Sequence, residues 1–108
     1  MKKKIRMMKA RIAYMYAKMK AEQLGKFTTK RQFVLMTDSG KLIVMGKELF
    51  YKMRRRGSMP TGITPRMLPR IAVYYTAGKH GGTMASAMPP ATAKIRKQKF
   101  LEYIGKIA

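Results

Sequence analysis

Three consecutive arginines, Arg54, Arg55 and Arg56, are the residues whose type and spacing most clearly indicate a chemical role. Successive helix residues point about 100° apart, so three guanidinium groups fan outward and cannot all meet one carboxylate. Arginine makes bidentate hydrogen bonds to phosphate oxygens, and we therefore expect the triplet to contact a phosphate backbone. The alternative is a solvated cluster whose charge suits the negative end of a helix.

Other basic side chains are expected to act in the same way. The predicted nucleic-acid-binding residues besides the triplet are Lys2, Lys3, Lys4, Arg6, Arg66, Arg70, Lys79, Lys94, Arg96, Lys97 and Lys99. Tyr51 and Tyr103 adjoin basic residues and are the candidates for stacking on bases. By contrast, the aromatic rings with apolar-face spacing are predicted to lie in the core, at Phe33, Phe50 and Phe100.

Residues 76–83 are rich in glycine and include Lys79 and His80. A nucleotide-binding phosphate loop needs a glycine directly before Lys-Ser/Thr at the start of a helix, and this segment lacks that order. Two interpretations remain open for it. Either its glycines let the backbone approach phosphates closely, or it is a flexible surface loop.

The chain has few residues that could act as catalytic acids, bases or metal ligands. The acidic residues fall on four separate predicted elements, at Glu22, Asp38, Glu48 and Glu102, and the chain has one histidine. No spacing assembles a catalytic triad or a set of metal ligands. The absence of cysteine excludes disulfides and thiolate metal sites. We therefore predict a protein that is not an enzyme and that uses no metal or cofactor.

The charge balance indicates the class of partner. In 108 residues there are 25 Lys and Arg against 4 Asp and Glu, a formal net charge of +21. A body with this excess repels itself unless a polyanion lies beside it. The charge is spread along the whole chain, whereas a peripheral membrane protein concentrates it on one face or tail. Apolar runs are only a few residues long, so no membrane span is predicted.

Residues 2–24 are predicted to form a helix that ends at a C-cap glycine, Gly25. The 3-4-3-4 spacing of Ile5, Met8, Ile12, Met15 and Met19, widened by Tyr16, marks one apolar face or a coiled-coil-like seam. This methionine-rich face is expected either to join the core or to dock a protein partner or a second copy. The basic segment is also similar to an organelle transit peptide, but its lysine-rich and serine-free composition favours a retained structural helix.

The rest of the chain predicts an α+β fold. In chain order we expect a hairpin of strands 31–36 and 41–45 joined by a turn at 37–40, a helix at 47–56 ended by Gly57, a short helix begun by Thr64 and Pro65, a strand at 71–76, a loop to Pro90, and a helix at 93–106 capped by Thr92. The predicted organisation is a basic amphipathic helix (1–26), a small α+β core with a hairpin (27–76), a Gly/Pro loop (77–91) and a C-terminal helix (92–108). The two terminal helices form arms on a small single domain.

In its small size, basicity, lack of cysteine and short β core between helical arms, the chain resembles small ribosomal proteins. No ribosomal sequence motif accompanies the resemblance, so no residue role is carried over from that family. We expect a structural component of a ribosome, an organellar ribosome or a similar particle, with RNA favoured over DNA. The alternatives are a viral (phage) virion protein that contacts the packaged genome or acidic subunits, and a DNA-compaction protein that dimerises through helix 2–24.

Overall fold

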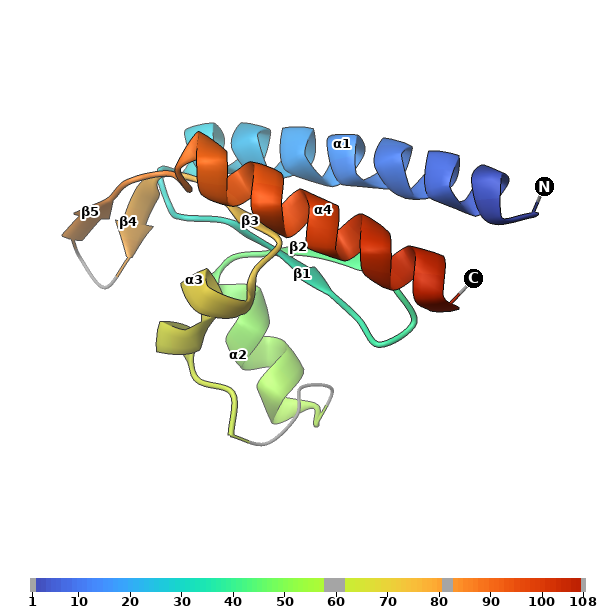
Figure 1. Ribbon diagram of the computed structural model, residues 1–108. Coiled ribbons are helices and arrows are strands. Elements are labelled where there is room, and N and C mark those ends of the chain that lie inside the picture. The colour runs from blue at the N-terminus through green and yellow to red at the C-terminus, as the bar shows by residue number, and fades with distance from the viewer. Residues whose placement is uncertain (1, 58–61, 81–82, 108) are drawn as a thin grey trace.

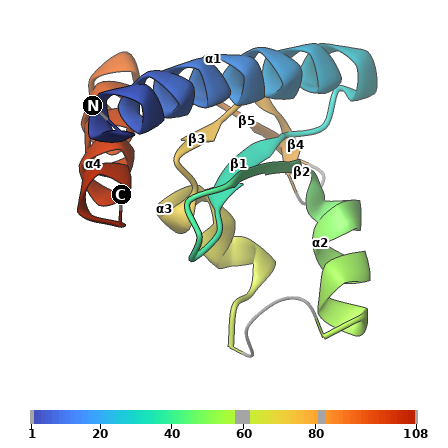
Figure 2. The same ribbon diagram turned by 90° about the vertical axis from the view of Figure 1, so that its right-hand side faces the viewer.

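The computed structural model describes residues 2–57, 62–80 and 83–107. At its centre lies an antiparallel sheet of three strands, β1 (Phe33–Met36), β2 (Leu42–Met45) and β3 (Tyr74–Tyr75), in the order β2-β1-β3. Helices cover both faces of this sheet (Figures 1 and 2), and the α+β fold class is confirmed.

The predicted hairpin of β1 and β2 is confirmed, and both strands are shorter than expected. Val34 pairs with Val44 of β2 and with Tyr74 of β3. In the turn, the Gly40 amide donates a hydrogen bond of 2.9 Å to the Thr37 carbonyl. Gly40 has φ +86°, a conformation that glycine adopts without a steric penalty.

Successive side chains of β1 point to opposite faces of the sheet and therefore pack into two different cores. On one face, α1 (Lys2–Thr28) and α4 (Pro90–Ile107) lie side by side (Figure 1). The core on this side contains Ala10, Tyr14, Ala17 and Ala21 of α1, Phe100 and Ile104 of α4, and Val34, Val73, Tyr74 and Met88. Three alanines on one helix face let α1 approach the sheet closely.

The opposite face carries α2 (Lys47–Arg55), a 3-10 turn η1 (Pro65–Met67) and α3 (Leu68–Ile71) (Figure 2). Its core consists of Phe33, Leu35, Met45, Phe50, Leu68 and Ala72. The three phenylalanines predicted to be core are all buried. Gly57 follows α2 with φ +73°, and Thr64 and Pro65 begin η1, as expected.

Two predicted boundaries near the sheet were wrong. Helix α1 continues through Gly25 to Thr28, so Gly25 is not a C-cap. Gly25 is buried, and a Cβ built on it would lie 2.9 Å from Thr76 Oγ1, so this glycine serves close packing instead of helix termination. The third strand is only Tyr74–Tyr75, because Ile71 belongs to α3.

The predicted loop from 77 to 90 was also wrong, since it contains a two-stranded hairpin of β4 (Gly78–His80) and β5 (Thr83–Ala85). Its anchor is non-local: the Lys79 amide donates to the Thr29 carbonyl at 2.9 Å, and the Arg31 amide donates to the Lys79 carbonyl at 3.3 Å. The side chain of His80, the histidine of this glycine-rich segment, lies outside the described residues. Helix α4 begins at Pro90, so Thr92 lies inside it and is not its cap.

Candidate nucleic-acid interface

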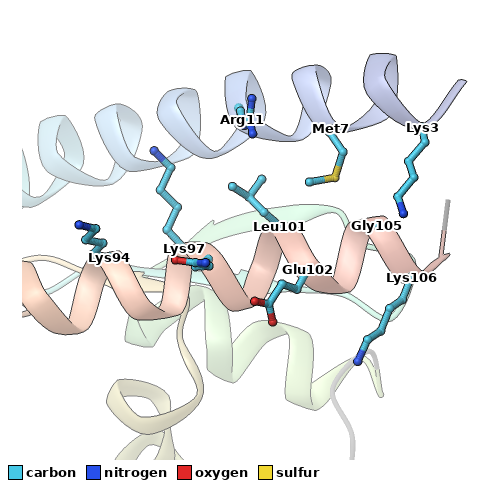
Figure 3. A pocket seen from close by; sticks show the side chains of 10 residues that line it. Lys3, Met7, Arg11, Lys94, Lys97, Leu101, Glu102, Gly105 and Lys106 are labelled. Carbon is cyan, nitrogen blue, oxygen red and sulfur yellow. The ribbon is translucent and has the colours of Figure 1, made fainter. Parts of the chain in front are cut away.

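A groove of about 790 Å³ runs between α1 and α4. Its floor is apolar: Met7 of α1 and Leu101 of α4 point toward each other between the helices, next to Gly105 (Figure 3). Absence of a side chain at Gly105 keeps this end of the groove open.

The walls of this groove are strongly basic. Lys3 and Arg11 contribute from α1, and Lys94, Lys97 and Lys106 contribute from α4, against one carboxylate, Glu102. Figure 3 shows Lys97 reaching from α4 toward α1. Its ammonium lies 5.3 Å from the centre of the Tyr14 ring, a cation–π contact. We call this site the basic groove.

Helical periodicity explains how these residues meet. Lys3, Met7 and Arg11 are spaced by four, which puts them on one side of α1. Lys94, Lys97 and Leu101 are spaced by three and then four, which puts them on one side of α4. Arg11 and Lys106 were not among the predicted binding residues. The four-residue spacing of Arg11 from Met7 and Lys3 was the signal that could have identified it.

A second, smaller groove of about 260 Å³ between α3 and α4 includes Arg70, Arg96 and Lys99. Arg96 has an internal role there. One guanidinium nitrogen, Nη1, donates hydrogen bonds of 2.7 Å to the carbonyls of both Pro69 and Ala72. These carbonyls lie at the C-terminal end of α3, where no helical amide is available to them. Arg96 therefore holds α3 to α4.

The arginine triplet lies on the other side of the sheet from the basic groove, at the end of α2 (Figure 2). All three residues are exposed. The backbone amide of Arg56 donates to the Lys52 carbonyl and closes the helix. Within the described residues the one ion pair joins Lys30 and Glu48 at 2.6 Å, so no carboxylate neutralises the triplet.

The other predicted binding residues are distributed over separate surfaces. Lys2, Lys4 and Arg6 are exposed on the first turns of α1, Arg66 is exposed on η1, and Lys79 is exposed on β4. The structure thus brings together Lys3, Lys94 and Lys97 in one groove, and Arg70, Arg96 and Lys99 in another. The remaining members do not form a single site.

The two candidate stacking tyrosines differ in their surroundings. Tyr103 is half-buried, and its hydroxyl donates a hydrogen bond to the carbonyl of Asp38 in the β1–β2 turn. Tyr51 is exposed on α2, with its ring edge-on to Phe50 at 5.7 Å between centroids. Tyr51 is therefore the more accessible of the two to a base.

Two of the four carboxylates are engaged within the fold. The Tyr74 hydroxyl donates to Glu22 Oε1 at 3.0 Å, and burial together with this contact raises the pKa of Tyr74 to about 12. Burial, and secondarily the charge of Glu22, raises the pKa of Tyr14. The hydrogen bond from Lys30 lowers the pKa of Glu48. These engaged carboxylates leave the basic surfaces with little internal compensation.

Among the described side chains, no three of His, Cys, Asp or Glu lie close enough together to hold a metal ion. No helix in the described ranges is both long and apolar enough to cross a membrane. Comparison of the chain with known protein families, curated proteins and solved structures finds no match.

Proposed function

We propose that the protein is a non-enzymatic structural component of a ribonucleoprotein particle, and that it binds RNA phosphates in the basic groove. The observation that supports this proposal is that five cationic side chains and one carboxylate line a single groove with an apolar floor. Lysine and arginine neutralise phosphates, and the released counterions drive binding without regard to sequence.

The dimensions of the groove suit a short stretch of strand. Lys94 and Lys106 are twelve residues apart on α4, a rise of about 18 Å. This length corresponds to roughly five nucleotides at about 3.4 Å each along a strand. None of the ten lining residues is aromatic, so contacts to the sugar-phosphate backbone are favoured over base stacking. Gln98 also lines the groove and supplies an amide that can pair with a ribose 2′-hydroxyl.

The first prediction concerns salt. For a single-stranded RNA of about 20 nucleotides, log K against log salt should have a slope of about −3.5 or steeper, since each neutralised phosphate contributes about 0.7. Replacing Lys94, Lys97 and Lys106 together with Ala should make this slope shallower by about 2 to 3. Fluorescence anisotropy over a series of salt concentrations measures both values.

The matched control is Lys26→Ala/Lys47→Ala/Lys52→Ala, which removes the same charge from exposed positions outside the groove. It should retain most of the original slope. If the control and the groove variant lose the same amount, binding is diffuse and the basic groove is not the site. A slope shallower than about −2 in the unmodified protein would mean that a polyanion is not the main partner.

The virion alternative relies on the same cations facing a packaged genome. The same assay separates the two candidates when duplex DNA and RNA of equal length are compared. Preference for RNA supports the ribonucleoprotein role, because Gln98 and the groove then read the ribose. Preference for duplex DNA would favour the virion protein.

A further inference from the structure

Helix α1 has two apolar faces, and only one of them is used by the fold. The buried face consists of Ala10, Tyr14, Ala17, Ala21 and Gly25. On the other face, Ile5, Met8, Ile12, Met15 and Met19 are 47% to 65% exposed. The structure thus answers one open question, because the methionine-rich face does not belong to the core. Since α1 lies along the outer edge of the molecule (Figures 1 and 2), this face is open to a partner.

The exposed residues have the spacing of a coiled-coil seam. Alternating steps of three and four place Ile5, Ile12 and Met19 at a positions and Met8 and Met15 at d positions of a heptad. The seam covers four turns, about 21 Å of helix. Tyr16, which is 67% exposed at an e position, widens the stripe on one side, and the alternating a and d spacing is the one that packs against a partner helix.

Charges beside the seam restrict the partner. The g positions are Lys4, Arg11 and Lys18, and the e position between the first two is Lys9. Lys4, Lys9 and Arg11 are exposed, whereas the Lys18 ammonium lies 5.2 Å from the centre of the Tyr74 ring. Side chains at e and g pair across a coiled coil and determine which helices associate.

A second copy of this chain is a poor partner for these charges. In a parallel pair of identical helices Lys4 would face Lys9 of the second copy, and an antiparallel pair would also oppose cations at these positions. Each copy also carries +21. A helix with Asp or Glu at its e and g positions meets the same cations with opposite charge.

The surface area of the molecule leaves room for such a partner. The protein exposes 7778 Å², whereas a compact monomer of 12.4 kDa exposes about 6100 Å². The surplus exceeds the roughly 800 Å² that one partner contributes to an interface of standard size.

We infer that the exposed seam of α1 is a docking surface for an amphipathic helix of an acidic protein, which packs its apolar stripe on Ile5, Met8, Ile12, Met15 and Met19 and pairs its carboxylates with Lys4, Lys9 and Arg11. This surface shares Arg11 with the wall of the basic groove, but its apolar seam lies outside that groove.

The test uses the full chain and three designed helical peptides. One has Leu at a and d with Glu at e and g, the second has Lys at e and g, and the third is a scrambled form of the first with the heptad removed. The acidic heptad peptide should bind at least about tenfold more tightly than either of the others in isothermal titration calorimetry. Equal binding of the heptad and scrambled peptides would overturn the inference, because charge alone would then suffice.

A pair of variants separates the seam from the rest of the surface without changing charge. Ile12→Ser/Met15→Ser should lower the affinity for the acidic peptide at least about tenfold, while the melting temperature and the salt slope for RNA stay unchanged. The control, Met84→Ser/Ile95→Ser, changes apolar residues of similar exposure elsewhere and should bind normally.

Three further outcomes would contradict the acidic-helix inference. The first is a seam variant that binds the peptide as well as the unmodified protein does. The second is a dimer in sedimentation equilibrium that Ile12→Ser/Met15→Ser abolishes, which would assign the seam to a second copy. The third is binding to anionic phosphatidylserine vesicles that the same variant abolishes, which would assign it to a lipid surface.

Discussion

Individual cationic residues of this protein divide into those that the fold uses and those that it leaves free. Arg96 donates hydrogen bonds to two backbone carbonyls. Arg31 donates to the carbonyls of Thr76 and Ser86, and its guanidinium carbon lies 4.1 Å from the centre of the Tyr75 ring. Burial lowers the pKa of Arg31. A basic side chain in a very basic protein is therefore not by itself a binding residue. Its hydrogen bonds within the fold indicate whether its role is structural.

Arg96 should contribute to stability more than to RNA binding. Arg96→Ala leaves the carbonyls of Pro69 and Ala72 without a donor, and we expect the free energy of unfolding to fall by about 1 to 3 kcal/mol. Lys99→Ala, at an exposed neighbouring position, should change it by less than about 0.5 kcal/mol. Urea denaturation checks both values. A larger loss of RNA affinity than of stability in Arg96→Ala would show that this guanidinium contacts the ligand.

Tyr74 should make stability depend on pH in the alkaline range. Its pKa is about 12 in the folded protein, above the usual phenol value of about 10 in the unfolded chain. The neutral phenol is therefore favoured by folding, so its contribution is complete below about pH 10 and is lost as the pH rises toward 12. In urea denaturation between these values, Tyr74→Phe should show a smaller decline than the unmodified protein. Tyr51→Phe is the control, and its free energy of unfolding should decline with pH as that of the unmodified protein does. A Tyr74→Phe profile parallel to that of Tyr51→Phe would show that Tyr74 does not cause the alkaline loss of stability.

Among the elements, local sequence signals were sufficient for most helices and for the β1–β2 hairpin. Asp38 and Gly40 between two apolar runs determine a turn whatever the rest of the chain does. The short third strand could not be bounded in this way. Tyr74 and Tyr75 are strand residues because β1 pairs with them, a contact far away in sequence.

The face that α1 buries could not be predicted from hydrophobicity. Periodicity identified Ile5, Met8 and Ile12 as the apolar stripe, whereas the fold buries alanines and Tyr14 on the opposite side. Small residues contribute little to a hydrophobic pattern, but they allow a helix to lie close against a sheet. The groove residues Arg11 and Lys106 were missed for a related reason, since their grouping depends on how α1 and α4 pack.

The end of α2 offers a test of binding that is independent of the basic groove. Replacing Arg54, Arg55 and Arg56 together with Ala should weaken RNA binding more than stability. Their role in folding is a screened interaction with the helix dipole, about 0.3 to 1 kcal/mol each, together with one long, exposed hydrogen bond of 3.4 Å from Arg55 Nε to the Tyr51 carbonyl. Charge-assisted hydrogen bonds to phosphate contribute about 1.5 to 3 kcal/mol each. Anisotropy and urea denaturation of the same variant compare the two.

Replacing the triplet with three lysines tests the role of the guanidinium group. Lysine keeps the charge but lacks the planar fork. Equal affinity of the lysine variant and the unmodified protein would mean that the triplet supplies only diffuse charge. A loss of stability as large as the loss of affinity in the alanine variant would place the triplet in the fold and not in the interface.

At the scale of the whole molecule, charge repulsion acts on a body that is also elongated. The extents are 47 × 31 × 20 Å, and in the part of the chain that the structure describes the +21 charge is offset by a single internal ion pair. Repulsion of this kind destabilises the compact state, and salt or a polyanion relieves it. The protein is therefore expected to reach its full stability only with its partners.

We therefore expect the melting temperature to rise with salt and to rise further with RNA. A ligand at about 100 times its dissociation constant stabilises the folded state by about 2.7 kcal/mol, which corresponds to a shift on the order of 10 °C in a domain of this size. Differential scanning fluorimetry at low salt, with and without RNA, measures the shift. The melting temperature of Lys94→Ala/Lys97→Ala/Lys106→Ala should rise less at the same RNA concentration, because this variant has a lower affinity for RNA. Its self-repulsion is also lower, so the comparison uses the shift caused by RNA and not the melting temperature itself. An unchanged or lower melting temperature between about 50 and 500 mM salt would show that self-repulsion does not limit stability, because the Debye length falls from about 14 Å to about 4 Å over that range.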